Sequence, residues 1–400
     1  MIMKDSTSFK RNLLLCMTLG LVTYGCGGGS SKPETPVTPT PITPVPVIPT
    51  PASTIEAQFS LWLTDLSNNV ILPKYQTLHS SAKNFSEESQ LFCQLNSTSK
   101  ADLDNLTASW MVLNLDWQRI QWLKIGPVID HNRNLRVQLW PNRSGTVGQN
   151  VENLLLNQSV LNAAAVAKTS VSGQGIPALE YLLFPKSNQE SLLNASNKDK
   201  RCEVVMAIGG NIVNIINEVY QEWSPTGGNY VQTVIEGTGE FMQLGVPSVK
   251  DAVEEIVTNW LGQIEHVKDE KMLKPLGEVA PGFVQIIEFE LSDASIKSLQ
   301  ANVHSFEEIY SAGNGHGFNN ILTDFLQQEG IATQMNEKIG AAIIAVDALS
   351  GHYSELLKSV EGRITIAEAI QKLRELRDLL TADFVQATDI NIGFNSNDGD

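Results

Sequence analysis

The segment from Gly175 to Phe184 carries one acidic side chain, Glu180, in an otherwise apolar run. If it is buried, a carboxylate in such surroundings has a raised pKa, which is typical of metal-binding, acid–base and ligand-binding sites. A structural role is the alternative. Pro177 can open a helix because its missing N–H falls in the first turn, and the helix dipole would then favour the charge of Glu180. Burial of Glu180 decides between the two interpretations.

Three further segments hold side chains that could bind a metal ion. His352-x-x-Glu355 places an imidazole and a carboxylate on one helix face, but these are only two ligands, and an exposed helix face is the alternative. In Gly313–Gly317, which contains His316, no strand precedes the glycines and no lysine follows, so we predict a turn between helices. The segment Asn395–Asp400 is rich in oxygen ligands but lacks calcium-loop spacing, and we predict a C-terminal coil.

A bacterial export signal is predicted at residues 1–25. Positive side chains precede a short apolar run, Leu13–Val22, of about ten residues, which is too short to span a bilayer. The tetrapeptide that ends at Cys26 resembles a lipobox, which predicts lipid attachment, including palmitate, at Cys26. Gly27 follows in place of Asp and indicates the periplasmic face of the outer membrane. A plain secretory signal cleaved nearby is the alternative.

Two cysteines remain in the mature chain, Cys93 and Cys202, because Cys16 leaves with the signal and Cys26 takes the lipid. In an oxidising envelope compartment an isolated pair of this kind is a natural disulfide. Two buried free thiols are the alternative. Neither cysteine has the close Cys or His spacing of a zinc site.

The composition is typical of a soluble globular protein with a proper core, because 42% of the residues are hydrophobic and 18% are charged. The net charge of −16 repels phosphate backbones, so nucleic acid is excluded as a partner, whereas cations are tolerated. The sequence has no His-Glu-x-x-His motif, no Gly-x-Ser-x-Gly elbow and no phosphate-binding Gly-x-x-x-x-Gly-Lys motif.

The chain divides into four parts. The signal is followed at 26–52 by the lipidated cysteine and a disordered Gly/Pro-rich linker, whose eight prolines favour an extended spacer that holds the body off the membrane. The loop Ser224–Asn229, rich in glycine and proline, predicts a boundary between two helical bundles at 53–224 and 225–400.

From Thr54 onward apolar residues recur with helical spacing and strand alternation is scarce, which predicts an all-α fold. Capping signals predict helix starts at Ser99, Ser248 and Thr365, each of which is followed three residues later by an acidic residue. Four-helix packing in each half would bury the apolar stripes. Besides the helix after Thr365, the predicted helices are 55–70, 101–123, 149–167, 199–223, 248–270, 293–311, 318–330 and 331–359.

Several segments, taken in order, resemble the imelysin (insulin-cleaving peptidase) family. The resemblance is to its branch of periplasmic lipoproteins similar to iron-regulated protein A, and it covers about Thr54 to Asp400. The segments that carry it are Trp117-Gln118, Ile125–Pro127, Trp140-Pro141, Gly175–Phe184, Arg201-Cys202, Ala207–Asn211, Lys271–Gly277, Ser292, Ser295, Asn302 and Gly393–Asp400.

The resemblance implies two helical-bundle domains packed together, with a cleft near their interface. The family motif is Gly-x-His-x-x-Glu, proposed to bind metal. Gly175 and Glu180 match it, but Pro177 stands at the histidine position and offers no lone pair, so direct metal ligation and peptidase activity do not carry over. No catalytic residue is assigned. The candidate ligand-binding residues are Gly175, Glu180, Trp140 and Arg143 from the first half, and Ser292 and Ser295 from the second.

The resemblance implies an envelope lipoprotein that is a non-catalytic binding component of iron or other metal uptake. Its expected partners are the membrane, through the lipid anchor, an iron or other divalent metal ion or a metal chelate, and an envelope protein. Two alternatives stay open, an imelysin-type metallopeptidase and a structural or scaffolding lipoprotein. Stoichiometric metal binding would favour the binding component or the peptidase, and peptide cleavage would single out the peptidase.

Overall fold

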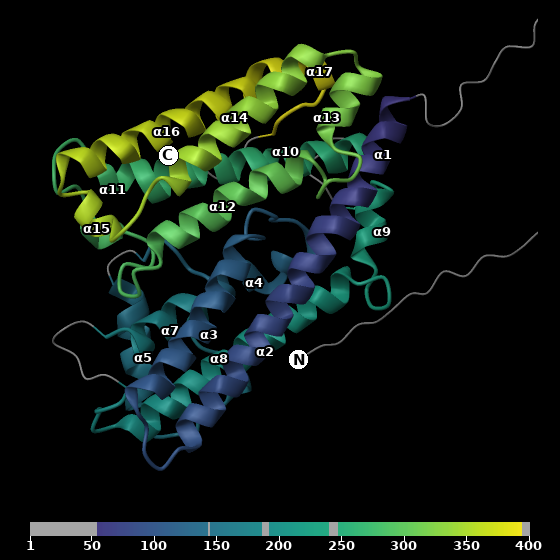
Figure 1. The fold of residues 1–400 in the computed structure, drawn as a ribbon. Coiled ribbons are helices and arrows are strands. Elements are labelled where there is room, and N and C mark those ends of the chain that lie inside the picture. Colours follow the sequence, from purple (N-terminus) through teal and green to yellow (C-terminus); the bar gives the residue numbers. More distant parts are fainter. Residues whose placement is uncertain (1–53, 143–144, 186–191, 240–246, 394–400) are drawn as a thin grey trace, which may run out of the picture. The chain divides into compact units, whose positions relative to one another are not determined.

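The computed structural model describes residues 54–142, 145–185, 192–239 and 247–393. The predicted signal, Cys26, the linker, Arg143 and the oxygen-rich C-terminal segment lie outside these residues. Within the described residues the chain is helical and forms no β-strand, so the all-α prediction is confirmed (Figure 1).

The first bundle is built on one long helical run. α1 (Ile55–Leu66) continues through the π-helical turn η2 (Ser67–Ile71) into α2 (Leu72–Gln94). Three further helices complete this bundle with α2: α3 (Lys100–Gln118), α7 (Gly175–Leu183) and α8 (Lys198–Trp223). The short elements of this half are η3 (Gly126–Val128), η4 (Asp130–Asn132), α4 (Arg133–Val137), α5 (Thr146–Leu156), α6 (Ala163–Val166) and η6 (Val171–Gly173).

The second bundle packs four long helices, α10 (Val249–Glu265), α12 (Ser295–Tyr310), α14 (Glu329–Asp347) and α16 (Val360–Leu379). α10 passes directly into the π-helix η7 (His266–Leu273). The remaining elements are α9 (Tyr230–Ile235), α11 (Lys274–Leu276), η8 (Val284–Ile286), α13 (Phe318–Asn320), η9 (Ile321–Phe325), α15 (Tyr353–Leu356), η10 (Leu380–Phe384) and α17 (Val385–Thr388).

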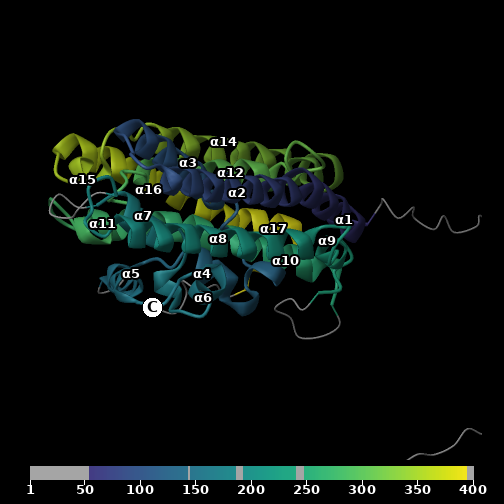
Figure 2. The same cartoon turned by 90° about the horizontal axis from the view of Figure 1, so that it is seen from below.

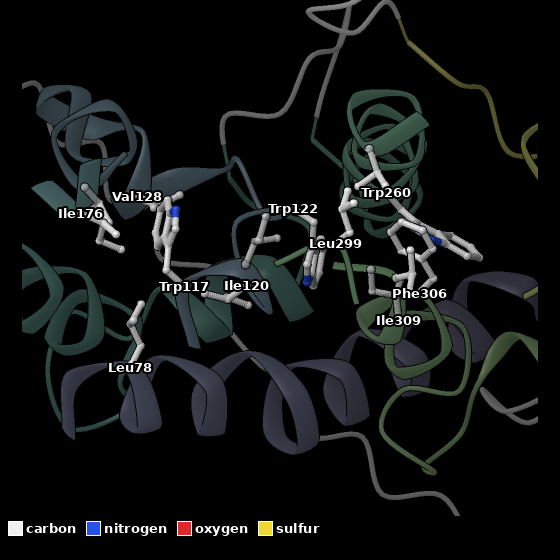
Figure 3. Packing of buried hydrophobic residues seen from close by; sticks show 14 of the residues in the cluster. Leu78, Trp117, Ile120, Trp122, Val128, Ile176, Trp260, Leu299, Phe306 and Ile309 are labelled. Carbon is white, nitrogen blue, oxygen red and sulfur yellow. The ribbon is translucent and has the colours of Figure 1, made fainter. Parts of the chain in front are cut away.

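A continuous hydrophobic core joins the two bundles. α1 packs on α10, and α12 packs on α3. Figure 3 follows this core from Ile176 and Trp117 in the first half, past Trp122, to Trp260 in the second. These side chains are almost completely buried, and burial of large aromatic groups is the main favourable contribution to the folding free energy.

α8 is long and apolar enough to cross a membrane by length and composition alone. In the structure it packs against α2, α6 and α7, and its apolar side chains point into the bundle, among them Ile208, Ile212, Ile215 and Val219. The i, i+3, i+4 spacing of such residues is that of a core helix.

Two of the predicted helix starts are confirmed. Ser99 forms a capping box with Asp102, and the side chain of Ser248 accepts a hydrogen bond from the backbone N–H of Asp251. The start at Thr365 is wrong, because α16 begins earlier, after Ser359, whose extended backbone lets its Oγ accept from the N–H of Gly362 at 2.9 Å.

Other predicted helix boundaries also need correction, among them that of 149–167, which is broken between the end of α5 at Leu156 and the start of α6 at Ala163. The predicted helix 331–359 is interrupted after α14, where Gly351 adopts a φ of +82° that a helix cannot accommodate. The first predicted helix, 55–70, is too short, because the chain stays helical to Gln94 through η2 and α2. Pro73 does not stop it: it lies where the π-helical turn η2 passes into α2, and the helical run continues through it.

The loop Ser224–Asn229 lies between the last helix of the first bundle and α9. α8 ends at Trp223, and Asn229 adopts a φ of +56° before α9 begins. The described residues from Thr54 to Gly393 belong to one compact unit. The domain boundary after residue 224 remains a prediction.

Candidate functional site

Gly175 fixes the start of α7, the helix that carries Glu180. Its φ is +76°, and a Cβ atom at this position would lie 2.2 Å from the carbonyl oxygen of Val137 and 2.5 Å from that of Arg136. Only glycine combines a positive φ with so close a backbone contact. The contact holds α7 against α4 and sets the position of Glu180, about one and a half turns further along the helix.

Glu180 is buried, with 7% of its surface exposed. Its Oε1 accepts hydrogen bonds from the backbone N–H of Ser292 at 3.0 Å and from the Ser292 hydroxyl at 2.7 Å. Ser292 lies in the turn before α12, so this pair joins a helix of the first half to a loop of the second. Burial favours the interpretation of Glu180 as a site residue over that of an exposed first-turn charge.

Burial raises the pKa of Glu180 to about 7. The two hydrogen bonds from Ser292 oppose this shift, and the negative charges of Glu288 and Glu290 add to it. A carboxyl group with a pKa near neutrality is populated in both forms, so Glu180 can donate a hydrogen bond when protonated and accept a proton when ionised.

Glu180 lines a cavity of about 700 Å³, which we call the Glu180 cavity. Its walls come from the chain around Trp140, from α5, from α7 and from the segment 284–291; α5 and α7 lie side by side (Figures 1 and 2). Glu152 and Glu290 also line it, and none of the described lining residues is Lys, Arg or His. The cavity therefore presents negative charge and hydrogen-bond acceptors to a ligand.

A buried ion pair lies next to this cavity. Nζ of Lys271, on η7, is 2.8 Å from Oε2 of Glu288, and both side chains are almost completely buried. Lys271 also donates to the side-chain oxygens of Gln118 and Asn302, each at 2.9 Å, and Gln138 donates to Oε1 of Glu288 at 2.5 Å. Burial lowers the pKa of Lys271, and the charge of Glu288 opposes that shift.

The ion pair and the Glu180 cavity are coupled. Ile287 and Phe289, on either side of Glu288, line the cavity, and the charge of Glu288 contributes to the raised pKa of Glu180. Lys271 lies in the π-helix η7, and π-helical segments are frequent at functional sites. The ion pair of Lys271 and Glu288 and its hydrogen bonds, which we call the polar network, thus hold the wall of the Glu180 cavity that contains Ile287 and Phe289.

The residues around Glu180 do not fit a directly bound metal ion. Pro177 lines the cavity one turn before Glu180 and has no lone pair to offer. In the part of the chain that the structure describes, no group of three or more His, Cys, Asp or Glu side chains is placed to hold a metal. Four ligands are usual for zinc and six or more for calcium, so these residues do not supply a coordination shell.

The structure brings three of the predicted site residues together. Glu180 and Trp140 line the Glu180 cavity, and Ser292 binds Glu180. Gly175 is a positioning residue, as its contact with α4 shows.

Two predicted site residues are not placed at the cavity. Ser295 is buried, and its hydroxyl donates to the backbone oxygen of Glu288 at 2.5 Å, so it holds the chain beside the cavity without lining it. Arg143 falls between the described segments.

Glu288 and Gln138 belong to the polar network around Lys271 but were not predicted as site residues. Glu288 lies in the mostly apolar segment Val284–Leu291, but Gln285 and Glu290 lie there too, so it does not stand out as Glu180 does in its own segment. Gln138 carries no comparable signal, because a single glutamine near the end of a short helix is unremarkable in a sequence.

The two histidine candidates have other roles. His352 Nδ1 lies 2.7 Å from a carboxylate oxygen of Asp293, whereas Glu355 pairs with Lys358, so the His352–Glu355 pair is not joined in a metal site. His316 lies in the glycine-rich turn that follows α12, as predicted, and its backbone N–H donates to Asp65 at 2.6 Å.

Cys93 and Cys202 form a disulfide whose Cα atoms are 5.6 Å apart. It ties the end of α2 to the beginning of α8, the two most extensively packed helices of the first bundle.

Fold and site together define an all-α protein of two helical bundles, with a buried carboxylate in the wall of a cavity that both halves line. The family model for Imelysin matches residues 71–380, and the chain belongs to the imelysin family. No curated protein sequence matches it.

Two solved structures share this fold. An imelysin-like protein from Psychrobacter arcticum 273-4 is 18% identical, with a TM-score of 0.69 over 85% of this chain and 98% of the other. A protein of Parabacteroides distasonis ATCC 8503, described as an iron-regulated protein A precursor, is 16% identical, with a TM-score of 0.66 over 82% of this chain and 95% of the other.

Proposed function

We propose that this protein is a non-catalytic binding component of iron or other metal uptake in the bacterial envelope, and that its ligand occupies the Glu180 cavity. The buried carboxylate of Glu180 in a cavity of about 700 Å³ is the observation that carries the proposal. Small-molecule sites typically have volumes of about 300–1,000 Å³ and a few well-placed polar groups on apolar walls.

The chemistry of the walls favours a metal complex over a bare ion. The donor set does not fit direct ligation, whereas the three carboxylates Glu152, Glu180 and Glu290 would attract a complex with positive charge or N–H and O–H donors. Trp140 supplies an aromatic surface against which an organic chelator can pack.

The association with iron rests on the resemblance of the fold. One of the structural neighbours is described as an iron-regulated protein A precursor, and we extend that association to this chain as part of the proposal. The export signal and Cys26 support a lipid-anchored position on the periplasmic face of the outer membrane, where a chelate would be met after it has crossed that membrane.

A metallopeptidase is the second candidate, because a carboxyl group with a pKa of about 7 has the proton affinity of a general base at neutral pH. It needs metal ligands that the described residues around Glu180 do not provide. Incubation of the metal-supplemented full chain with insulin, followed by mass spectrometry, tests this candidate. Cleavage that is lost in Glu180→Gln would establish the peptidase and overturn the non-catalytic proposal.

The binding proposal is tested by elemental analysis of the full chain and by calorimetry. The probes are ferrioxamine B, a ferric complex with a free amine, ferric citrate, a negatively charged complex, and free ferrous, ferric, copper and zinc ions. We expect ferrioxamine B to bind more tightly than ferric citrate, and Glu180→Gln to weaken binding at least tenfold.

Glu368→Gln makes the same chemical change on an exposed face of α16 and is the matched control, expected to bind like the wild type. If none of the complexes binds, or if Glu180→Gln binds ferrioxamine B unchanged, the Glu180 cavity is not the site. Stoichiometric binding of a free ion that is lost in Glu180→Gln would contradict the preference for a complex.

A further inference from the structure

A second cavity, of about 270 Å³, shares Trp140 with the Glu180 cavity, and we call it the Lys124 cavity. It is formed where the end of α3, the segment of α4 and the first residue of η7 meet. Trp140 lines both cavities. Besides Trp140, its walls include Trp117, Lys124, Gln138 and His266.

The Lys124 cavity has no carboxylate among its described lining residues. This is unusual in a protein with a net charge of −16, and it is the reverse of the Glu180 cavity, in which three carboxylates and no cationic side chain are found among the described lining residues. Nitrogen donors dominate the wall instead: an ammonium, an imidazole, two indoles and several side-chain amides.

Lys124 is a partly buried lysine without a counter-charge. Among the described residues its Nζ has neither an ion-pair nor a hydrogen-bond partner, and no carboxylate raises its pKa, which burial and the charge of Lys271 lower. The other cations in this region are paired: Lys271 with Glu288, and Lys274 with Glu270. An inward-facing ammonium with no carboxylate partner is costly unless something else compensates its charge.

The neighbouring groups add neutral hydrogen-bond donors to the ammonium of Lys124. His266 is partly buried, its ring lies edge-on to Trp140 with 5.5 Å between ring centroids, and burial together with Lys271, Lys124 and Lys274 holds its pKa well below the ordinary value. The indole N–H of Trp117 is buried and has no hydrogen-bond partner in the described part of the chain. The cavity thus combines uncompensated positive charge with unused donors.

We propose that the Lys124 cavity binds a small oxyanion, a carboxylate or phosphate group, through the ammonium of Lys124 and the ring nitrogen of His266. The volume of about 270 Å³ holds roughly nine water molecules, which is enough for phosphate or a short polycarboxylate. A bound anion would supply the counter-charge that Lys124 lacks, and charge-assisted hydrogen bonds of this type are the strong ones. The site does not depend on the proposed function, because Glu180 does not line it.

The test is calorimetry of the full chain with sodium phosphate and with sodium citrate, in a buffer that contains neither anion. Binding of either anion is expected, and the one that binds identifies the oxyanion class. Lys124→Gln is expected to weaken that affinity at least tenfold, and Lys124→Arg is expected to retain most of it. Lys100→Gln, which removes the same charge from an exposed residue of α3, is the matched control and should change the affinity less than twofold.

A second readout keeps the proposal testable if Lys124→Gln folds poorly. Addition of the anion to the wild-type chain should shift the indole N–H resonances of Trp117 and Trp140 in a ¹⁵N–¹H spectrum, with Trp117→Phe and Trp140→Phe used for assignment. The proposal is overturned if neither anion binds, if Lys124→Gln binds as tightly as the wild type, or if the anion leaves both indole resonances unmoved.

Discussion

The two cavities that Trp140 lines have opposite chemistry. The Glu180 cavity is large, faces both bundles and is lined by carboxylates, whereas the Lys124 cavity is smaller and is lined by nitrogen donors. Burial disfavours the charged forms of ionisable groups in both: it raises the pKa of Glu180 in the first cavity and lowers the pKa of Lys124 and of His266 in the second. The same low-dielectric interior therefore raises the pKa of a buried acid and lowers the pKa of a buried base.

The buried pair Lys271–Glu288 explains how the two cavities can lie so close together. Gln138 lines the Lys124 cavity and donates to Glu288, and the charge of Glu288 is felt by Glu180. On the other side, the charge of Lys271 lowers the pKa of His266. The ion pair thus acts on both cavities: Glu288 raises the pKa of Glu180, and Lys271 lowers the pKa of His266 and of Lys124.

Removal of the ion pair should have the largest effect. Lys271→Met leaves Glu288 buried without a cation, and we expect the free energy of unfolding to fall by about 3–5 kcal/mol. Denaturant unfolding measures this change. The double variant Lys271→Met/Glu288→Gln should recover at least half of the loss, because it no longer buries an uncompensated charge.

Lys274→Met is the control, because Lys274 is half exposed and paired with Glu270 at the surface, so the change should be below about 1 kcal/mol. If the double variant were no more stable than Lys271→Met, the ion pair would not be the element that connects the cavities.

Gly175→Ala should cause the next largest loss of unfolding free energy. The new Cβ would collide with the carbonyl oxygens of Val137 and Arg136, and φ at this residue is +76°, so we expect a loss of about 3–4 kcal/mol in unfolding free energy. Because α7 carries Glu180 and α4 carries part of the Lys124 cavity, ligand binding in both cavities should weaken together. Thermal unfolding and calorimetry of the same samples check this.

Gly330→Ala serves as the control, because Gly330 lies at the start of α14 with nothing within 4 Å of the added Cβ. Here alanine should raise stability by up to about 1 kcal/mol. An equal response of the two variants would show that the close contact at Gly175 does not hold the cavities in place.

The sequence was sufficient for the helical class, because apolar periodicity and capping side chains are local signals. Ser99 and Ser248 were identified as caps from their side-chain type and from the acidic residue three positions later. Thr365 shows the limit of this approach. It has the same pattern but already lies inside α16, where its hydroxyl donates to the backbone oxygen of Glu361 at 3.0 Å, because Ser359 caps the helix first.

The site was predictable only where one residue stands out against its neighbours. Glu180 was found because it interrupts an apolar segment, and its partner Ser292 only through a resemblance. The Lys124 cavity could not be found in this way, because Lys124 and His266 are 142 positions apart in the sequence and neither is unusual locally. The absence of a carboxylate partner, which is what distinguishes Lys124, is a property of the folded chain.

Glu180 and His266 should change the free energy of unfolding in opposite directions as the pH rises. The pKa of Glu180 is about 7 in the folded chain and near 4.5 in the unfolded one, so the folded state binds more protons between these values, and its stability falls as pH rises from 4.5 to 7. At about 1.4 kcal/mol per pKa unit the upper bound is about 3.5 kcal/mol, and we expect about 2 kcal/mol. His266 acts in the opposite direction, because its lowered pKa makes stability fall as pH drops below 6.5.

Denaturant unfolding from pH 4 to pH 8 tests both signs. Glu180→Gln should remove the loss of stability above pH 4.5 and become more stable than the wild type at pH 8. His266→Gln should remove the opposite slope below pH 6.5. Glu368→Gln should follow the wild-type curve throughout. Parallel curves for the wild type and Glu180→Gln would mean that Glu180 is not shielded from solvent as the structure shows.

Trp140→Ala should have the smallest effect, and it tests whether the two cavities share a wall. The indole lines both cavities, and one aromatic contact contributes about 1 kcal/mol, so we expect about fivefold weaker binding of ferrioxamine B in the Glu180 cavity and of the oxyanion in the Lys124 cavity. Leu91→Ala, at an exposed residue that lines neither cavity, should leave both affinities unchanged. A loss confined to one ligand would show that Trp140 belongs to that cavity alone, and the opposite charges of the two cavities would then be independent features of the fold.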